Sequence, residues 1–223
     1  MIDGGRGDAR EDDRQEATMG DGYQAGRGCD PGVSLAALLP RSRFITCDDI
    51  RVTAVQDDAA RCRPGDVFVA RLTARGDGHD AVSQALARGA RGVIAERMVP
   101  TEGVGLCLVP DSDYALARLA HALAGEPSQA LRVIAVTGTS GKTTTAWLSA
   151  AILAEAGLRV GVLSDLGCLS ADDALPELGD YSHPTALAGW LARLAADGCS
   201  HAVVEVSGTA TAAFTPWSPT HQA

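Results

Sequence analysis

The chain has 223 residues, of which 46% are hydrophobic, and a formal net charge of -9. This length accommodates one large domain or two small ones, and the hydrophobic content excludes a chain that is disordered throughout. The acidic balance argues against a general affinity for nucleic acid or for an anionic membrane, because both attract basic surfaces.

The six cysteines are scattered and form no C-x-x-C pair. This pattern indicates neither a zinc site nor a disulfide framework, and it is typical of a protein kept reduced in the cytoplasm. The sequence also lacks the uninterrupted apolar run of about 18 residues that a membrane-spanning helix needs. We therefore expect a cytoplasmic protein with neither a membrane span nor a secretion signal.

Residues 1–32 are rich in acidic residues and glycine and contain almost no apolar residues. Such a composition cannot offset the entropy lost on ordering, so a disordered leader is predicted. A misassigned start codon explains the same stretch equally well, and Met19 would then be the true start.

Residues 33–126 have the pattern of a small α/β domain. Ser34 is placed to cap a short helix at 35–39, which Pro40 ends. Further strands are predicted at 50–55, 67–71, 92–95 and 105–109, and further helices at 80–88 and 111–124. Trp190, in the next part of the chain, is expected in a core because it lies at helical spacing among leucines.

A second α/β block begins after a polar break at 125–129. The apolar run 131–137 predicts a strand buried on both faces. It is followed by predicted helices at 142–156 and 185–196 and strands at 159–163 and 201–206. This alternation implies parallel pairing with right-handed crossovers. Two prolines and no periodicity follow Phe214, where another strand–helix unit would be needed, so residues 131–223 are predicted to be a truncated parallel-sheet domain.

A glycine-rich loop joins the first strand and the first helix of this block. Its residues are Gly138, Thr139, Ser140, Gly141, Lys142, Thr143 and Thr144. Converging backbone N–H groups, a helix N-terminus and a lysine are what a phosphate-binding loop requires. The strict loop pattern has a glycine where this chain has Val136, but Lys142 is the only lysine of the chain. We expect an ATP-binding loop with Lys142 as its catalytic residue; the alternative is a glycine turn with a surface lysine.

A nucleotide site of this kind also needs Mg²⁺, which prefers oxygen ligands. Thr143 offers a hydroxyl, and Glu205 is an acid inside an otherwise apolar strand, which is costly unless the carboxylate is paired or bound to metal. Thr143 and Glu205 are therefore the predicted metal ligands. The alternatives are a surface-facing Glu205, or Asp165 as the acidic ligand.

In these residues and in several further motifs, the chain resembles the Mur ligase family, most closely its MurE type. Residues 137–144 match the family's TGTxGKTT loop, and residues 63–70 resemble its PGDLFVA strand. Residues 77–80 and 92–96 are similar to its DGHD and AVIAE segments, and Glu205 begins a stretch similar to its EVSSH motif.

The resemblance implies ATP-dependent amide synthesis through an acyl phosphate, with ATP and Mg²⁺ as cofactors. UDP-MurNAc-peptide and an amino acid would be the substrates, with no nucleic acid or membrane partner. Residues 33–126 would bind the UDP-substrate and residues 131–223 would be the central ATP-binding domain. Lys142 would contact the β- and γ-phosphates.

The substrate motifs depart from the family pattern. The family's DSR reads Asp58-Ala59-Ala60, its TTP reads Ser182-His183-Pro184, and its SSH reads Ser207-Gly208-Thr209. The candidate substrate residues are Asp58, Ser182, His183 and Ser207. A substrate role and a plain loop position remain open for His183. For His79, a capping or surface role is favoured over a substrate contact.

The resemblance ends near Phe214, ahead of the family's third domain. Two hypotheses follow. The chain is part of a MurE-like ligase whose remaining groups another chain supplies or the gene model omits, or it is a divergent, non-catalytic ATP-binding module.

Overall fold

The computed structural model describes residues 32–74, 76–170, 174–175, 181 and 183–206. The predicted leader at 1–32 therefore lies almost entirely outside the described residues. The described residues contain two five-stranded sheets, one formed within residues 43–108 and one within residues 132–205. We refer to residues 33–124 as the first-sheet part and to residues 131–206 as the second-sheet part; their division into two domains remains a prediction.

The first sheet has the strand order β2-β9-β8-β5-β4. These strands are β2 (Arg43–Ile45), β9 (Gly105–Leu108), β8 (Gly92–Ala95), β5 (Val67–Val69) and β4 (Val55–Gln56). Pairing is parallel except for β2, an antiparallel edge strand. Two small antiparallel pairs accompany the sheet: β1 (Val33–Ser34) with β3 (Arg51–Val52), and β6 (Leu72–Thr73) with β7 (Gly76–Asp77).

Helices cover both faces of the central strands. They are α1 (Leu35–Leu38), η1 (Ala59–Arg61), η2 (Gly78–Ala81), α2 (Val82–Ala87) and α3 (Ser112–Leu123). Val67 and Val69 belong to the core cluster that contains residues of α1 and α3, whereas Phe68 belongs to the cluster that contains residues of α2. Successive side chains of β5 thus enter opposite cores, which explains why its sequence is continuously apolar.

The second sheet has the order β10-β14-β11-β12-β13. Its strands are β10 (Arg132–Val136), β14 (His201–Glu205), β11 (Val160–Ser164), β12 (Gly167–Leu169) and β13 (Ala174–Leu175). The strands β10, β14 and β11 are parallel, as the strand–helix alternation predicts, and β12 and β13 are added antiparallel. The short helix η3 (Pro127–Gln129) precedes β10.

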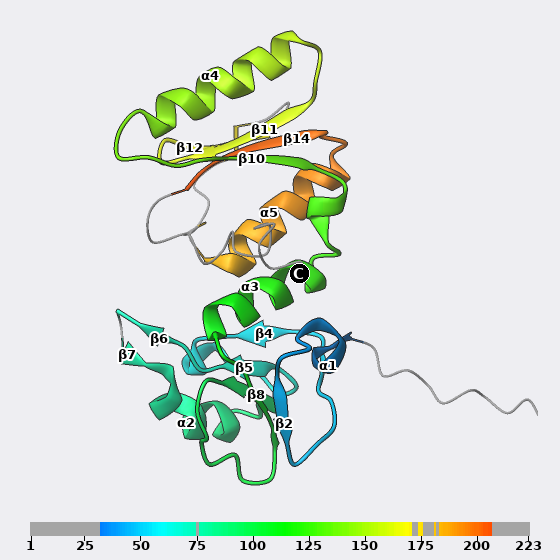
Figure 1. The fold of residues 1–223 in the computed structure, drawn as a ribbon, viewed down its shortest axis with the longest axis vertical. Coiled ribbons are helices and arrows are strands. Elements are labelled where there is room, and N and C mark those ends of the chain that lie inside the picture. Colours follow the sequence, from blue (N-terminus) through cyan, green and yellow to red (C-terminus); the bar gives the residue numbers. More distant parts are fainter. Residues whose placement is uncertain (1–31, 75, 171–173, 176–180, 182, 207–223) are drawn as a thin grey trace, which may run out of the picture. The chain divides into compact units, whose positions relative to one another are not determined.

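The helices α4 (Lys142–Glu155) and α5 (Pro184–Ala196) lie on opposite faces of this sheet (Figure 1). The core cluster under α4 contains Ala146, Val162 and Val203, and the cluster under α5 contains Leu191 and Trp190. Trp190 is 4% exposed, so its predicted core position is confirmed.

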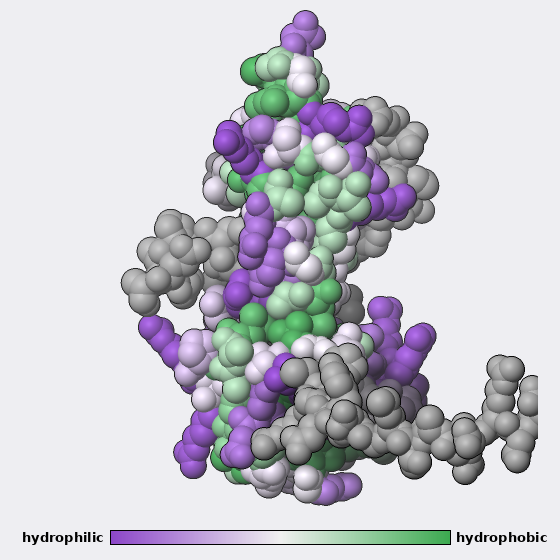
Figure 2. All heavy atoms as spheres, turned by 90° about the vertical axis from the view of Figure 1, so that its right-hand side faces the viewer, coloured by the Kyte–Doolittle hydropathy of each residue, from purple (hydrophilic) through white to green (hydrophobic). Residues whose placement is uncertain are grey.

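The prediction that β10 is buried on both faces is wrong. Arg132 and Ala135 are exposed, and Ile134 keeps 38% of its surface accessible. Among the described residues β10 pairs with β14 alone, so it lies at the edge of the sheet. On α4, Leu148 and Ile152 are 59% and 69% exposed. Figure 2 shows hydrophobic surface on this part of the molecule, where α4 lies at the top.

Other differences are smaller. The predicted strand 50–55 divides into β3 and β4, and the predicted helix 80–88 begins as the 3₁₀ turn η2. The short strands β2, β12 and β13 have no strong period and were not predicted. Among the described residues no helix is long and apolar enough to cross a membrane.

Gly161, in β11, packs against α5 so closely that a larger residue is excluded. A Cβ atom at this position would lie 2.3 Å from Leu194 Cδ1, and Leu194 is fully buried. We expect Gly161→Ala to lower the free energy of unfolding by about 1–3 kcal/mol, because the fully buried Leu194 side chain would have to shift to make room for the added methyl group. Urea denaturation checks this value.

Gly189→Ala, in α5, is the matched control. A Cβ atom there would meet nothing within 4 Å, and Gly189 has an ordinary helical conformation. This variant should be neutral or more stable by up to about 1 kcal/mol. Equal stability of the two variants would contradict the tight packing of β11 against α5.

Candidate nucleotide-binding site

The glycine-rich loop occupies the carboxyl edge of the parallel sheet. β10 ends at Val136 and α4 begins at Lys142, so residues 137–141 form the connection. In the parallel register, Val136 lies opposite Glu205, the last residue of β14. The strand order therefore brings an acidic residue next to the start of the loop, although 62 residues separate Thr143 from Glu205.

Two glycines permit the loop conformation. Gly138 has φ 151° and Gly141 has φ 74°, a left-handed conformation at the N-cap of α4. No side chain caps this helix end. Its first N–H groups are thus available to an anion, which is the arrangement that binds phosphate at helix N-termini.

Glu205 is the centre of the polar contacts at this edge. Its Oε2 accepts hydrogen bonds from Thr143 Oγ1 at 2.8 Å and from the backbone N–H of Asp165 at 3.2 Å. Its Oε1 lies 3.6 Å from Lys142 Nζ. That distance allows an ion pair but not a hydrogen bond, which is why Oε1 is also a buried oxygen without a hydrogen-bond partner.

These groups fit a magnesium ion and a polyphosphate. Glu205 is only 8% exposed, and a buried carboxylate with an unused oxygen is costly unless a cation is close to it. Within the described residues no group of three or more His, Cys, Asp or Glu side chains is placed to hold a metal. A site with few protein ligands suits Mg²⁺, which keeps several waters and also binds substrate phosphates.

The structure brings together Lys142, Thr143 and Glu205, and it leaves the other predicted loop residues at the surface. Thr139, Ser140 and Thr144 are exposed. The surface-facing alternative for Glu205 is wrong, because the side chain is buried. Asp165 contributes its backbone N–H to Glu205, so it lies at the same edge of the sheet.

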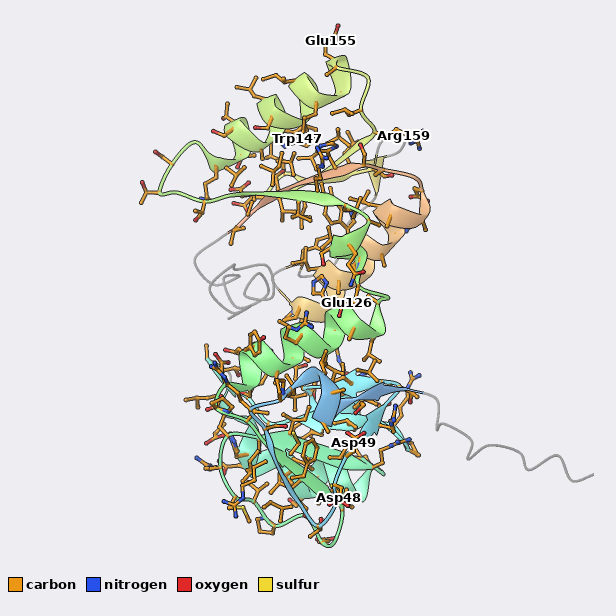
Figure 3. All side chains as sticks on the ribbon, turned by 45° about the vertical axis from the view of Figure 1, so that its right-hand side comes forward. Asp48, Asp49, Glu126, Trp147, Glu155 and Arg159 are labelled. Carbon is orange, nitrogen blue, oxygen red and sulfur yellow. The ribbon has the colours of Figure 1, made fainter. Side chains whose placement is uncertain are left out.

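Trp147 contacts the same edge of the sheet, one helical turn after Thr143 on the same face of α4. Figure 3 shows its ring on the side of α4 that faces the sheet. Its Nε1 donates to Ser164 Oγ at 2.9 Å, at the end of β11. The indole thereby ties α4 to the strand that precedes Asp165.

The candidate substrate residues do not all fall within the described part of the chain. Ser182 and Ser207 lie outside the described residues. Asp58 caps η1, accepting a hydrogen bond from the Ala60 N–H. His183 is the N-cap of α5 and contacts Asp57, a residue that sequence patterns did not single out.

His79 is neither a surface residue nor a cap. It is 8% exposed, with Nδ1 at 2.6 Å from Asp77 Oδ1 and Nε2 accepting from the Glu96 N–H at 3.2 Å. Glu96 in turn accepts two hydrogen bonds from Ser112, at the start of α3. The favoured surface or capping role was therefore wrong: this histidine joins η2 to the ends of β8 and α3.

The fold and the loop together define an α/β protein with a P-loop type strand–loop–helix unit. Residues 136–215 match the Mur ligase middle domain family. This segment is therefore similar to a Mur ligase middle domain, and the chain resembles the Mur ligases over most of its length.

Individual relatives agree with this assignment. UDP-N-acetylmuramyl-tripeptide synthetase of Deinococcus radiodurans is 38% identical over 183 residues, which cover 80% of this chain and 37% of the relative. A UDP-N-acetylmuramoyl-L-alanyl-D-glutamate--2,6-diaminopimelate ligase of Syntrophomonas wolfei is 43% identical over 119 residues, 53% of this chain and 24% of the relative.

A solved structure of a UDP-N-acetylmuramoyl-L-alanyl-D-glutamate--2,6-diaminopimelate ligase superposes with a TM-score of 0.59 at 25% identity, covering 79% of this chain and 36% of that one. The chain thus spans little more than a third of the length of these proteins.

Proposed function

We propose that the chain binds ATP and Mg²⁺ as the nucleotide-binding part of a MurE-like ligase, which adds an amino acid to a UDP-MurNAc-peptide. The observation that carries the proposal is the buried Glu205 carboxylate between the Thr143 hydroxyl and the Lys142 ammonium. The printed names of the relatives, a tripeptide synthetase and diaminopimelate ligases, support the choice of substrates.

In the proposed reaction, a substrate carboxylate attacks the γ-phosphorus of ATP and ADP leaves. The resulting acyl phosphate is attacked by the amine of the amino acid, which forms the amide and releases phosphate. A bound Mg²⁺ would neutralise charge on the phosphate oxygens.

The residues of this chain would act by positioning and by charge. The open N-terminus of α4 would donate N–H groups to phosphate oxygens, and Lys142 would neutralise negative charge on the outer phosphates. Thr143 and Glu205 would hold the metal ion. The remaining groups of a ligase would come from polypeptide outside these residues, on this chain or on a separate one.

The proposed location is the cytoplasm. Cys47, Cys62, Cys107, Cys168 and Cys199 are all free thiols, as expected in a reducing compartment.

The second candidate is a non-catalytic ATP-binding module. The observation in its favour is that His183, at one of the predicted substrate positions, is bonded to Asp57 within the chain itself. This hypothesis predicts the same nucleotide binding without turnover. Incubation with ATP, Mg²⁺, UDP-MurNAc-dipeptide and a panel of amino acids, together with a polypeptide that supplies the remaining ligase domains and with phosphate release as readout, separates the two functions.

Calorimetric titration with ATP, with and without Mg²⁺, tests the nucleotide site itself. We expect binding that Mg²⁺ strengthens. In Glu205→Gln, the factor by which Mg²⁺ increases the ATP affinity should be at least about tenfold smaller, which corresponds to about 1.4 kcal/mol. The reason is that the amide keeps the shape of the carboxylate but carries no charge for the metal. Binding of ATP without any Mg²⁺ effect in the unmodified chain would contradict the proposed metal site.

Glu155→Gln is the matched control. Glu155 is an exposed carboxylate at the last residue of α4, far along the helix from the loop (Figure 3). This variant makes the same change of charge on the same helix and should leave both the ATP affinity and its Mg²⁺ dependence unchanged.

A further inference from the structure

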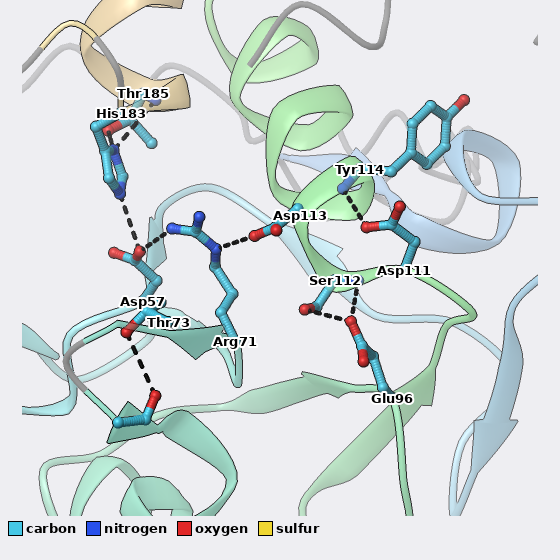
Figure 4. Close-up of polar contacts among 11 residues, drawn as sticks. Asp57, Arg71, Thr73, Glu96, Asp111, Ser112, Asp113, Tyr114, His183 and Thr185 are labelled. Carbon is cyan, nitrogen blue, oxygen red and sulfur yellow. Dashed lines mark hydrogen bonds and ion pairs between the residues drawn. The ribbon is translucent and has the colours of Figure 1, made fainter. Parts of the chain in front are cut away.

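A second group of charged and polar side chains lies away from the nucleotide loop. It consists of Asp57 after β4, Arg71 before β6, Asp113 in the first turn of α3 and His183 at the N-cap of α5 (Figure 4). Arg71 Nη1 lies 2.6 Å from Asp57 Oδ2, and Arg71 Nε lies 2.5 Å from Asp113 Oδ1. One guanidinium therefore holds two carboxylates of the first-sheet part in fixed positions.

His183 joins this group from the second-sheet part. Its Nε2 lies 2.9 Å from Asp57 Oδ2, across 126 residues of sequence. Its Nδ1 lies 2.8 Å from Thr185 Oγ1 and accepts from the Thr185 backbone N–H at 3.4 Å. Because Nδ1 acts as the acceptor that caps α5, the ring proton is on Nε2, which donates to Asp57.

The Asp57 carboxylate is well suited to accept this bond. Burial favours its neutral form, but the hydrogen bonds from His183 and Arg71, together with the charge of Arg71, outweigh burial and lower its pKa to about 2. Asp57 is therefore ionised at neutral pH. Its side chain is 19% exposed and that of Arg71 is 16% exposed, so water screens the pair only weakly.

The residue type at position 183 decides whether the contact exists. The Mur ligase pattern has a threonine there, and a threonine hydroxyl caps a helix as well as histidine does. A threonine side chain ends at Oγ1, however, whereas the imidazole of His183 has a second nitrogen that extends beyond the helix N-terminus. Only the longer side chain can accept from the first turn of α5 and donate to Asp57 at the same time.

We propose that Asp57 and His183 form a clasp that fastens the N-terminus of α5 to the first-sheet part, with Arg71 and Asp113 holding Asp57 in place. His183 is one of the predicted substrate positions, and Asp58, another, directly follows Asp57. The clasp therefore fixes these two positions relative to one another. A ligand that needs the His183 ring has to displace Asp57 first. This inference concerns the free protein and does not depend on the proposed ligase function.

Hydrogen exchange of the full chain, measured without nucleotide, tests the clasp. Asp57→Ala should speed exchange in the first turns of α5, around Leu187 and Ala188, by about fivefold or more, although Asp57 is remote in sequence. His183→Thr keeps a cap on α5 and should speed exchange around η1 by a comparable factor. The double variant should exchange no faster than the faster single variant, because both changes remove one interaction.

Asp48→Ala is the matched control: Asp48 is an exposed carboxylate of the first-sheet part, and Figure 3 shows its place. It removes the same charge and should leave both segments unchanged. If Asp57→Ala does not fold, Asp57→Asn carries the same expectation with a smaller increase. Unchanged exchange in α5, or single-variant effects that multiply in the double variant, would overturn the proposal.

Discussion

Replacing Lys142 by alanine is expected to lower the affinity for ATP with Mg²⁺ by at least about a hundredfold, or about 2.7 kcal/mol. The ammonium lies at the N-terminus of α4, 3.6 Å from Glu205 Oε1 and 20% exposed. Its loss removes the cation of the loop and also leaves the buried Glu205 carboxylate without an opposite charge, which would repel a polyphosphate. Titration calorimetry of the two proteins under identical Mg²⁺ concentrations measures the difference.

Two further variants define what the lysine contributes. Arg132→Ala removes an exposed cation from the amino end of β10 and should leave the affinity unchanged. Lys142→Arg retains the charge but replaces a compact ammonium by a planar guanidinium, so we expect an intermediate loss. Full affinity in Lys142→Ala would refute the phosphate-loop assignment.

The stability of the protein is expected to fall as pH drops from about 6.5 to 4, because His121 is buried in the neutral form. His121 lies in α3 with 1% of its surface exposed, and burial, with a smaller contribution from Arg118, lowers its pKa to about 4. Below pH 6.5 the unfolded chain binds a proton that the folded chain does not. The shift from an ordinary value near 6.5 corresponds to a loss of roughly 3 kcal/mol when the pH reaches 4.

Urea denaturation at pH 7.5 and pH 4.5 measures this loss. In His121→Leu the difference between the two pH values should shrink by about 2–3 kcal/mol, because no group is left to titrate there. His201→Gln, at a half-buried position in β14, serves as the control and should keep the difference. A His121→Leu protein with the original pH dependence would contradict the prediction.

Asp57 titrates in a lower pH range than His121, and its contribution to stability is likewise lost as pH falls. Its folded pKa is lowered from 3.8 to about 2, so its contribution is complete above pH 3.8 and is lost as pH falls toward 2. Measurements at pH 4.5 and above therefore report on His121 while Asp57 stays ionised.

Much of the fold follows from local patterns. The apolar run 92–95 coincides with β8, and the predicted helix 111–124 differs from α3 by one residue at each end. These elements were predictable because β8 is a continuous apolar run, because α3 has apolar residues at helical spacing, and because Asp111 caps the helix with its own side chain. Glu205 was conspicuous for a related reason, since an acid in an apolar strand needs a partner.

The features that were not predicted from the sequence depend on contacts between residues that are far apart in the chain. The exposure of β10 depends on which strands flank it, and a run of apolar residues is the same at an edge as in a centre. The bond from His183 to Asp57 joins residues 126 positions apart, and neither has a periodic or motif signal that points to the other. His79 looked like a surface residue because its two partners, Asp77 and the Glu96 N–H, meet only in the folded chain.

The open edge of β10 has a consequence for the nucleotide loop. Among the described residues this strand leaves one row of backbone donors and acceptors unpaired, beside the exposed Ile134. An extended segment from any source that added to this edge would bond to the same strand that runs directly into Gly138. Strand addition at β10 and the proposed phosphate binding at its end would then involve the same strand, and we expect occupancy of this edge to change the affinity for nucleotide.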